Sequence, residues 1–184
     1  GETQDVAIGP DDMLYVSSLQ SKHILKFDPA TGAFLGNFTS GYELKKPTKI
    51  SFAADGYLYV SQWGEDQSSV VRFNAQTGAF DRDCSGPQAA PLGQALDAAG
   101  NLYVACFYSK DVRKFSPDGA YLGVAVAADQ LKGPSNIWFD QEGALLVADW
   151  DSGAIKRFRA TGDSYVFERE FASGFARLEG VALG

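Results

Sequence analysis

The sequence predicts an all-β protein assembled from a repeated unit of four strands. A stretch of the form turn, strand, loop, strand, turn, strand occurs four times, as in "DAAGNLYVACFYSKDVRKFSPDGAYLG" from Asp97 to Gly123. The chain contains 20 glycines and 13 % aromatic residues, a composition that suits short strands joined by tight turns. No segment of useful length has the apolar period of a helix, and only Asp129 to Lys132 could form one turn.

Each unit contains four strand signals in a fixed order. The first is an apolar triplet, and a tight turn such as Asp55-Gly56 leads to the second, an LYV-type run. The third alternates Lys or Arg with apolar residues, and a turn such as "PATGA" or "SPDGA" leads to the fourth. The triplets begin 42 to 45 residues apart, at Val6, Ile50, Ala95, Ile137 and Val181. Four strands in such a repeat, without helices, are typical of propeller blades, whereas the coils of β-solenoids are usually shorter.

We therefore expect a β-propeller built of four-stranded antiparallel blades, forming one domain or a part of one. The predicted blades are residues 6–49, 50–94, 95–136 and 137–180, and residues 181–184 begin a further blade. A first strand without neighbours would expose a sheet edge, which natural proteins avoid. Three arrangements remain open. The chain is part of a larger ring, or two copies complete one ring as a homo-oligomer, or four blades close alone with Val181 to Gly184 covering an edge.

The repeat resembles the NHL repeat family over nearly the whole chain. The resemblance rests on Pro47 and Pro134 before first strands, on the LYV-type second strands, and on a basic residue followed by Phe at the end of the third. These pairs are Lys26-Phe27, Arg72-Phe73, Lys114-Phe115 and Arg157-Phe158. The family often has Asp two residues after the valine of the second strand. Here only the fourth repeat has it, as Asp149; the other three repeats have Ser18, Gln62 and Cys106 at this position. Gluconolactonase and senescence-marker-type propellers share the general blade pattern.

The amino-acid composition limits the kinds of partner that the chain can bind. The net charge is −7 and the pI is near 4.6, so the surface repels phosphate backbones and we expect no nucleic acid. No run of 18 apolar residues occurs, so we expect no membrane partner. The remaining partners are proteins and small-molecule ligands. The sequence does not identify the compartment, although a secreted or periplasmic one is favoured.

The two cysteines, Cys84 and Cys106, have neither the spacing nor a neighbouring histidine for a zinc site. Buried free thiols are the expected state, and a disulfide between neighbouring repeats is the alternative in an exported protein.

The repeat also predicts where a binding site would lie. In a propeller blade, the residue before the first strand and the loop after the second meet at one face, around the mouth of the channel. The first set is polar and consists of Asp5, Lys49, Gln94 and Asn136. It mixes an acid, a base and amides, which favours function, because a purely structural position would tend to hold one residue type. Solvation of these groups without any function is the alternative.

The second set is apolar or aromatic and consists of Leu19, Trp63, Phe107 and Trp150, beside Tyr108 and Asp149. Aromatic walls with a few polar groups suit a small ligand or a peptide. The alternative is that these aromatic side chains only pack between blades.

Catalytic groups are sparse. His23 is the single histidine and lies in a loop, whereas propeller lyases rely on several. Asn136, within "PSNIWFD", resembles the asparagine that binds the divalent metal in gluconolactonase-like propellers. That resemblance implies calcium or zinc, but Lys49 would place a positive charge in the polar ring and oppose a cation there. We therefore expect a non-enzymatic NHL-like binding module or scaffold without a cofactor. The alternative is a divalent-metal-dependent hydrolase or lactonase of the gluconolactonase type.

Overall fold

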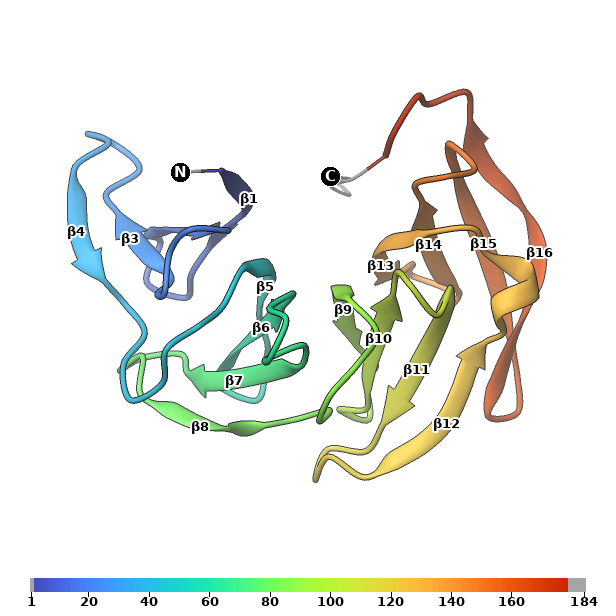
Figure 1. Cartoon of the computed structure of the whole chain (residues 1–184), viewed down its shortest axis with the longest axis horizontal. Helices are drawn as coiled ribbons and strands as arrows, with labels where there is room; N and C mark the ends of the chain where they lie inside the picture. The colour runs from blue at the N-terminus through green and yellow to red at the C-terminus, as the bar shows by residue number, and fades with distance from the viewer. Residues whose placement is uncertain (1, 179–184) are drawn as a thin grey trace. The chain divides into compact units, whose positions relative to one another are not determined.

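Sixteen strands and one turn of 3-10 helix, η1 (Ala128–Gln130), account for the regular structure of residues 2–178, which the computed structural model describes. The strands form four antiparallel sheets of four strands each (Figure 1). Both the all-β class and the four-stranded antiparallel blades are therefore confirmed. The expected start of a further blade at residues 181–184 lies outside the described residues. No helix among the described residues is long and apolar enough to cross a membrane.

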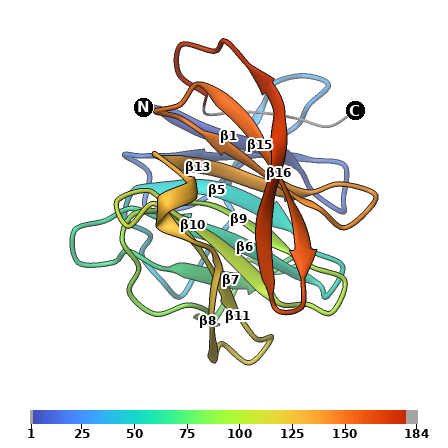
Figure 2. The same ribbon diagram turned by 90° about the vertical axis from the view of Figure 1, so that its right-hand side faces the viewer.

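Each blade is a meander in which consecutive strands pair. Blade 1 contains β1 (Thr3–Ile8), β2 (Leu14–Ser18), β3 (Leu25–Phe27) and β4 (Phe34–Asn37). Blade 2 contains β5 (Pro47–Phe52), β6 (Tyr57–Gln62), β7 (Val70–Asn74) and β8 (Phe80–Asp83). Blade 3 contains β9 (Pro91–Leu96), β10 (Leu102–Cys106), β11 (Asp111–Phe115) and β12 (Tyr121–Val126). Blade 4 contains β13 (Pro134–Phe139), β14 (Leu145–Asp149), β15 (Ala154–Thr161) and β16 (Ser164–Ser173), and its outer hairpin β15–β16 is the longest (Figure 2).

The chain divides into two compact units. Unit 1 ends at Pro87 and holds blades 1 and 2, and unit 2 begins at Gln88 and holds blades 3 and 4.

First strands begin three or four residues before the apolar triplets that predicted them. β5, for example, begins at Pro47 rather than at Ile50. The cause is a bulge: the pairing of the first strand with the second shifts register at its start in all four blades, as between Pro47 and Ile50. Bulges bend a strand and redirect its side chains. The predicted polar positions therefore lie inside the first strands, at or just after the irregular step.

An aromatic side chain of the second strand anchors the packing of blades within each unit. In unit 1, Tyr15 lies 4.8 Å from both Phe38 and Phe52, edge to face, and so joins blade 1 to blade 2. In unit 2, Tyr103 contacts Phe139 at 5.0 Å between ring centroids, which joins blade 3 to blade 4. Such contacts stabilise beyond the area that they bury.

A repeated polar contact ties the hairpin between the first two strands to the second strand. The hydroxyls of Tyr15, Tyr59 and Tyr103 donate to Asp11, Asp55 and Asp97, at 3.0, 2.8 and 3.3 Å. Buried tyrosines need such a partner for the hydroxyl. Both cysteines are buried and free, so the expected thiol state is the one observed.

Candidate functional site

One backbone hydrogen bond recurs at the same end of every blade. The N–H that follows the second strand donates to a carbonyl before or at the start of the first. The pairs are Leu19 to Glu2, Trp63 to Lys46, Phe107 to Ala90 and Trp150 to Gly133, at 2.8 to 3.0 Å. In each blade the residue after the second strand is thus bonded to a residue three or four positions before the predicted polar residue of the first strand. We call this end of a blade its loop end.

In unit 1, the polar residues Asp5 and Lys49 form an ion pair. The distance from Lys49 Nζ to Asp5 Oδ2 is 3.3 Å, and both side chains are mostly buried. The same carboxylate oxygen accepts the N–H of Ile50 at 3.0 Å. Because Asp5 lies on β1 and its partners on β5, these contacts join blades 1 and 2.

In unit 2, the amide residues Gln94 and Asn136 are buried on β9 and β13. Asn136 Oδ1 accepts the N–H of Ile137 at 2.9 Å. The two strands approach closely, because a Cβ on Gly93 would lie only 2.7 Å from the Cα of Asn136.

Three of the predicted aromatic residues, Trp63, Phe107 and Trp150, are half-buried. Phe107 packs between blades of unit 2, since a Cβ on Gly133 would lie 2.9 Å from Phe107 Cε2. The guanidinium of Arg177 lies 5.8 Å from the ring centroid of Trp150. Lys46 Nζ lies 6.0 Å from the ring centroid of Trp63. Tyr108 is exposed beside Phe107.

Asp149, the acidic residue that the family resemblance singled out, is completely buried. Its carboxylate accepts the N–H groups of Lys132 and Gly133, at 3.0 and 2.6 Å to Oδ1, and pairs with Lys156 Nζ at 2.7 Å. Burial alone would raise the pKa of Asp149, but the Lys156 ammonium and these N–H groups outweigh it and lower the pKa. The side chain therefore holds the segment before β13 in place.

Blade 2 achieves the same contact without charge. Gln62 occupies the position of Asp149, and its Oε1 accepts the N–H of Lys45 at 3.1 Å. Blade 3 makes a different contact, in which Gln88 Oε1, in the segment before β9, accepts a hydrogen bond from the Arg113 guanidinium at 3.0 Å. Sequence reasoning missed this shared role, because it compared residue types rather than the hydrogen bonds that they make.

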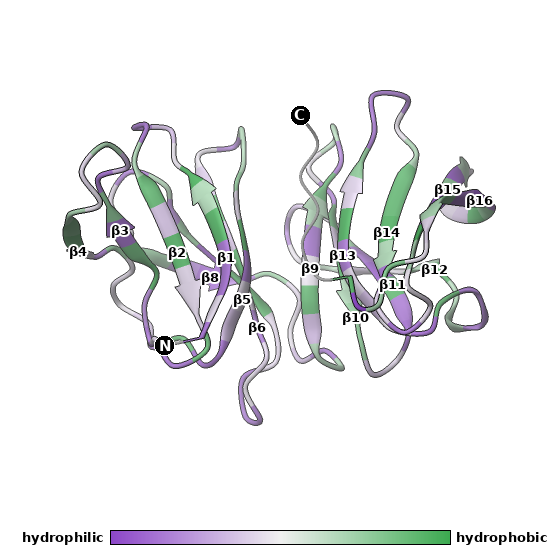
Figure 3. Ribbon diagram, turned by 90° about the horizontal axis from the view of Figure 1, so that it is seen from above, coloured by the Kyte–Doolittle hydropathy of each residue, from purple (hydrophilic) through white to green (hydrophobic). Residues whose placement is uncertain are grey.

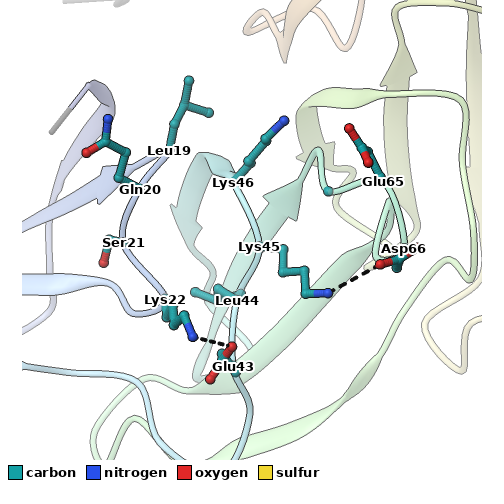
Figure 4. A pocket seen from close by; sticks show the side chains of 11 residues that line it. Leu19, Gln20, Ser21, Lys22, Glu43, Leu44, Lys45, Lys46, Glu65 and Asp66 are labelled. Atoms are coloured by element: carbon teal, nitrogen blue, oxygen red, sulfur yellow. Dashed lines mark hydrogen bonds and ion pairs between the residues drawn. The ribbon is translucent and has the colours of Figure 1, made fainter.

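A cavity of about 460 Å³ lies at the loop ends of blades 1 and 2, within unit 1 (Figure 4). Its lining comes from three loops and comprises Leu19, Gln20, Ser21, Lys22, Glu43, Leu44, Lys45, Lys46, Gly64, Glu65 and Asp66. Of the predicted residues, Leu19 lines the cavity directly. Trp63 precedes the lining residue Gly64, and its ring faces the Lys46 ammonium. The other lining residues were not predicted, since nothing in the repeat marks these loops.

Two lining residues present charges that are not paired within the described chain. Lys22 pairs with Glu43 at 2.8 Å, and Lys45 with Asp66 at 3.5 Å. By contrast, neither Lys46 nor Glu65 forms an ion pair with any of residues 2–178, and Figure 4 shows both pointing toward the same side. The Lys46 ammonium and the Glu65 carboxylate are thus available to a ligand.

Lys46 also has a strained backbone. Its φ is +48°, in the left-handed region that disfavours residues with a Cβ. Ala90, at the equivalent position of blade 3, has a φ of +58°. Strain of this kind persists where the surrounding structure enforces it, often at ligand sites. Here the Trp63 N–H to Lys46 carbonyl bond helps to enforce it.

The carboxylates near the loop ends do not suit a divalent metal. Asp5 is bonded to Lys49 and Ile50, and Asp149 to Lys156 and two backbone N–H groups. A cation bound at either carboxylate would lie beside an ammonium group, which costs free energy. Among residues 2–178, no three His, Cys, Asp or Glu side chains group closely enough to hold a metal ion.

The fold defines the class of the molecule, an all-β protein of the β-propeller type with four-stranded antiparallel blades. No family model and no curated protein sequence matches the chain. Solved structures do: a candidate gluconolactonase matches with a TM-score of 0.74 at 16 % identity, over 93 % of this chain and 64 % of that one.

Two further structures give the same result. A gluconolactonase from Xanthomonas campestris matches with a TM-score of 0.63 at 22 % identity, over 80 % of this chain and 54 % of that one. A streptogramin B lyase matches with a TM-score of 0.69 at 15 % identity, over 90 % and 53 %. The chain thus spans less than two thirds of the length of these three structures. At such identities the likeness shows the fold.

Proposed function

We propose that the chain is a non-enzymatic binding module whose loop ends take a small polar ligand or a peptide. The observation that carries this proposal is the cavity of unit 1, with the uncommitted charges of Lys46 and Glu65 at one side. A cavity of several hundred Å³ has the size of a small-molecule site, and eight of its eleven lining residues are polar or charged, which suits a polar ligand.

The chemistry of the cavity favours a ligand that carries both charges. A carboxylate would pair with Lys46, and an ammonium group with Glu65. Leu19 and the aliphatic stems of Lys45 and Lys46 supply apolar contact. Free amino acids and the ends of peptides have this combination. The cation–π geometry at Trp63 holds the Lys46 ammonium near the cavity.

The test is calorimetric titration with glycylglycine, its N-acetylated form and its amide. We expect the zwitterion to bind more tightly than either singly charged form. Lys46→Gln should weaken glycylglycine roughly three- to tenfold, as expected for one partly exposed ion pair. Glu65→Gln should do the same. The matched control is Lys110→Gln, because Lys110 is another exposed lysine at positive φ (+60°) but lies in unit 2. Absence of binding at millimolar concentration, or equal loss in the control, would refute the proposal.

The absence of a resident metal belongs to the same proposal, because the carboxylates of Asp5 and Asp149 are committed to internal cations. We expect no change in Tm when calcium, zinc or a chelator is added. A metal that binds the folded state, at a free concentration of 100 times its Kd, would stabilise the fold by about 2.7 kcal/mol, which a melting curve detects readily.

The alternative, a metal-dependent lactonase, is favoured only by the fold shared with the gluconolactonases. This alternative predicts that the protein hydrolyses lactones and that a chelator abolishes the activity. Such a result would replace the present proposal.

A further inference from the structure

A second cavity of unit 1 lies at the other end of blade 2, which we call its hairpin end. There the β5–β6 turn meets the β7–β8 turn, and the Ala75 N–H donates to the Gly56 carbonyl at 2.9 Å. Figure 3 shows the same layout in blade 1, with the start of β1 at one end and the β1–β2 hairpin at the other. The cavity has a volume of about 500 Å³, within the range of small-molecule sites. Its larger lining side chains are those of Pro10, Phe52, Asp55, Tyr57, Asn74 and Gln76.

The ring of Tyr57 is a fixed wall of this hairpin-end cavity. The guanidinium of Arg72 lies 3.9 Å from the ring centroid, in a cation–π contact. Arg72 is itself held by Asp81, with 2.6 Å from Nε to Oδ2, and its side chain is only 14 % exposed. A ligand can therefore pack against the ring without first ordering it, which lowers the cost of binding. Phe52 and Pro10 add further apolar surface.

The charge in this cavity is already balanced. Among its lining residues in the described part of the chain, only Asp55 is charged. Its Oδ1 accepts the N–H of Tyr57 at 3.1 Å, and its Oδ2 accepts the hydroxyl of Tyr59 at 2.8 Å. Oδ2 also lies 3.9 Å from Arg72 Nη1. The cavity thus favours an uncharged ligand, in contrast to the cavity at the loop ends.

Three neutral polar groups of the lining are not used by the fold. Asn74 Oδ1 accepts the N–H groups of Gln76 and Thr77, at 3.0 and 2.9 Å, which fixes the side chain. Its Nδ2 group has no hydrogen-bond partner among residues 2–178, and neither has the Gln76 side-chain amide or the Tyr57 hydroxyl. Amides and hydroxyls of this kind can donate to and accept from the hydroxyl groups of a ligand.

We propose that the hairpin end of blade 2 binds a neutral saccharide. A sugar ring has apolar C–H faces, which pack on aromatic side chains such as Tyr57 and Phe52. Its hydroxyl groups suit the amides of Asn74 and Gln76. A purely apolar ligand would leave these amides without hydrogen bonds, and an ion would find no free counter-charge. The site is separate from the cavity at the loop ends and does not depend on the ligand proposed there.

Blade 1 shows that the fold does not require these binding groups. Met13 occupies the position of Tyr57, and in both blades this N–H is bonded to an aspartate two residues earlier. Ala30 occupies the position of Gln76, and its N–H is likewise bonded to the side chain two residues earlier. Tyr57→Met and Gln76→Ala therefore install residues that the same turns already accept, and both variants should fold.

Saturation-transfer NMR titrations with maltose, cellobiose and lactose test the proposal. We expect at least one of these sugars to bind in the millimolar range. Tyr57→Met and Gln76→Ala should each weaken that binding roughly three- to tenfold, as expected for one ring contact or one hydrogen bond. The matched controls are Tyr121→Met and Gln141→Ala, which change exposed side chains of the same types in unit 2 and should leave binding unchanged. No binding of any of the three sugars, or equal losses in the controls, overturns the proposal.

Charged sugars then test the class of ligand. Methyl glucoside should bind more tightly than glucuronate or glucosamine, because the cavity offers no free counter-charge to a carboxylate or an ammonium group. Tighter binding of either charged sugar would overturn the assignment to neutral saccharides. Excess glycylglycine should not displace the bound sugar, because its proposed site lies at the loop ends. Displacement would overturn the separation of the two sites, whereas a failed glycylglycine titration leaves the saccharide result in place.

Discussion

Breaking the buried pair of Asp149 and Lys156 should destabilise unit 2 by about 2–4 kcal/mol. Asp149 is completely buried and the Lys156 side chain is 12 % exposed, so Asp149→Asn leaves an ammonium group almost without water or counter-charge. Removal of one partner of such a pair typically costs about 3–5 kcal/mol. The hydrogen bond from Lys156 to the Gln130 carbonyl, at 2.8 Å, survives and lowers the expected loss.

Blade 2 provides the compensating variant. There Gln62 occupies the position of Asp149 and Val71 that of Lys156, as the pairings Val60 to Val71 and Val147 to Lys156 show. The double variant Asp149→Gln/Lys156→Val installs this neutral combination in blade 4. It should recover stability to within about 1 kcal/mol of the wild type, the value of the hydrogen bond lost at Gln130.

The assay is urea unfolding followed by tryptophan fluorescence in a Trp63→Phe background. Trp138 and Trp150 then report on unit 2, since Trp63 belongs to unit 1. A single variant that costs less than 1 kcal/mol, or a double variant no more stable than the single one, would refute the reasoning.

The pH dependence has a definite sign. The pKa of Asp149 is lowered in the folded state from an ordinary value of 3.8, since the Lys156 ammonium and the backbone N–H groups offset its burial. The folded state thus binds this proton less readily than the unfolded state does. The stability from the pair is present above about pH 4 and is lost as the pH falls through the lowered pKa. The wild type should lose stability relative to the double variant below pH 4, and a constant difference would contradict this.

Three further predictions follow from close approach, strain and burial. Gly93→Ala should destabilise unit 2 by roughly 1–3 kcal/mol, because the new Cβ would lie 2.7 Å from the backbone of Asn136, and an unchanged urea midpoint would contradict it. Lys46→Gly and Ala90→Gly should each stabilise the folded protein by up to about 1 kcal/mol, because glycine relieves the cost of a positive φ. Only Lys46→Gly should weaken the binding of glycylglycine, and equal effects of both variants on binding would count against the cavity as its site. Cys106 should react with iodoacetamide at pH 8 only on unfolding, because burial raises the pKa of its thiol to about 12, and rapid labelling of the native protein would disprove it.

The fold was predictable because the repeat encodes it four times. The four apolar triplets within residues 2–178 and all four LYV-type runs became paired strands, since alternation and turn residues act locally. The bulge before Ile50 was not predictable, because the backbone hydrogen bond from Trp63 to Lys46 fixes it and no residue type marks that bond. The cavity was missed for a related reason. Its uncommitted charges, Lys46 and Glu65, stand out only when the ion pairs of neighbouring lysines and acids are known.

The variety of polar residues at repeat-equivalent positions also has a structural explanation in this fold. That variety favoured a functional ring at Asp5, Lys49, Gln94 and Asn136, yet Asp5 and Lys49 bond to each other and join two blades. At the end of the second strand, Gln62 and Asp149 differ in charge but accept equivalent backbone N–H groups. A neutral acceptor suffices where the neighbour is Val71, and an anion is required where it is Lys156. Different residues thus perform one structural task, each balanced by its own neighbour. We propose that a ligand group differs from a structural one in lacking such balance, and Lys46, at the loop ends of unit 1, combines this lack with a positive φ.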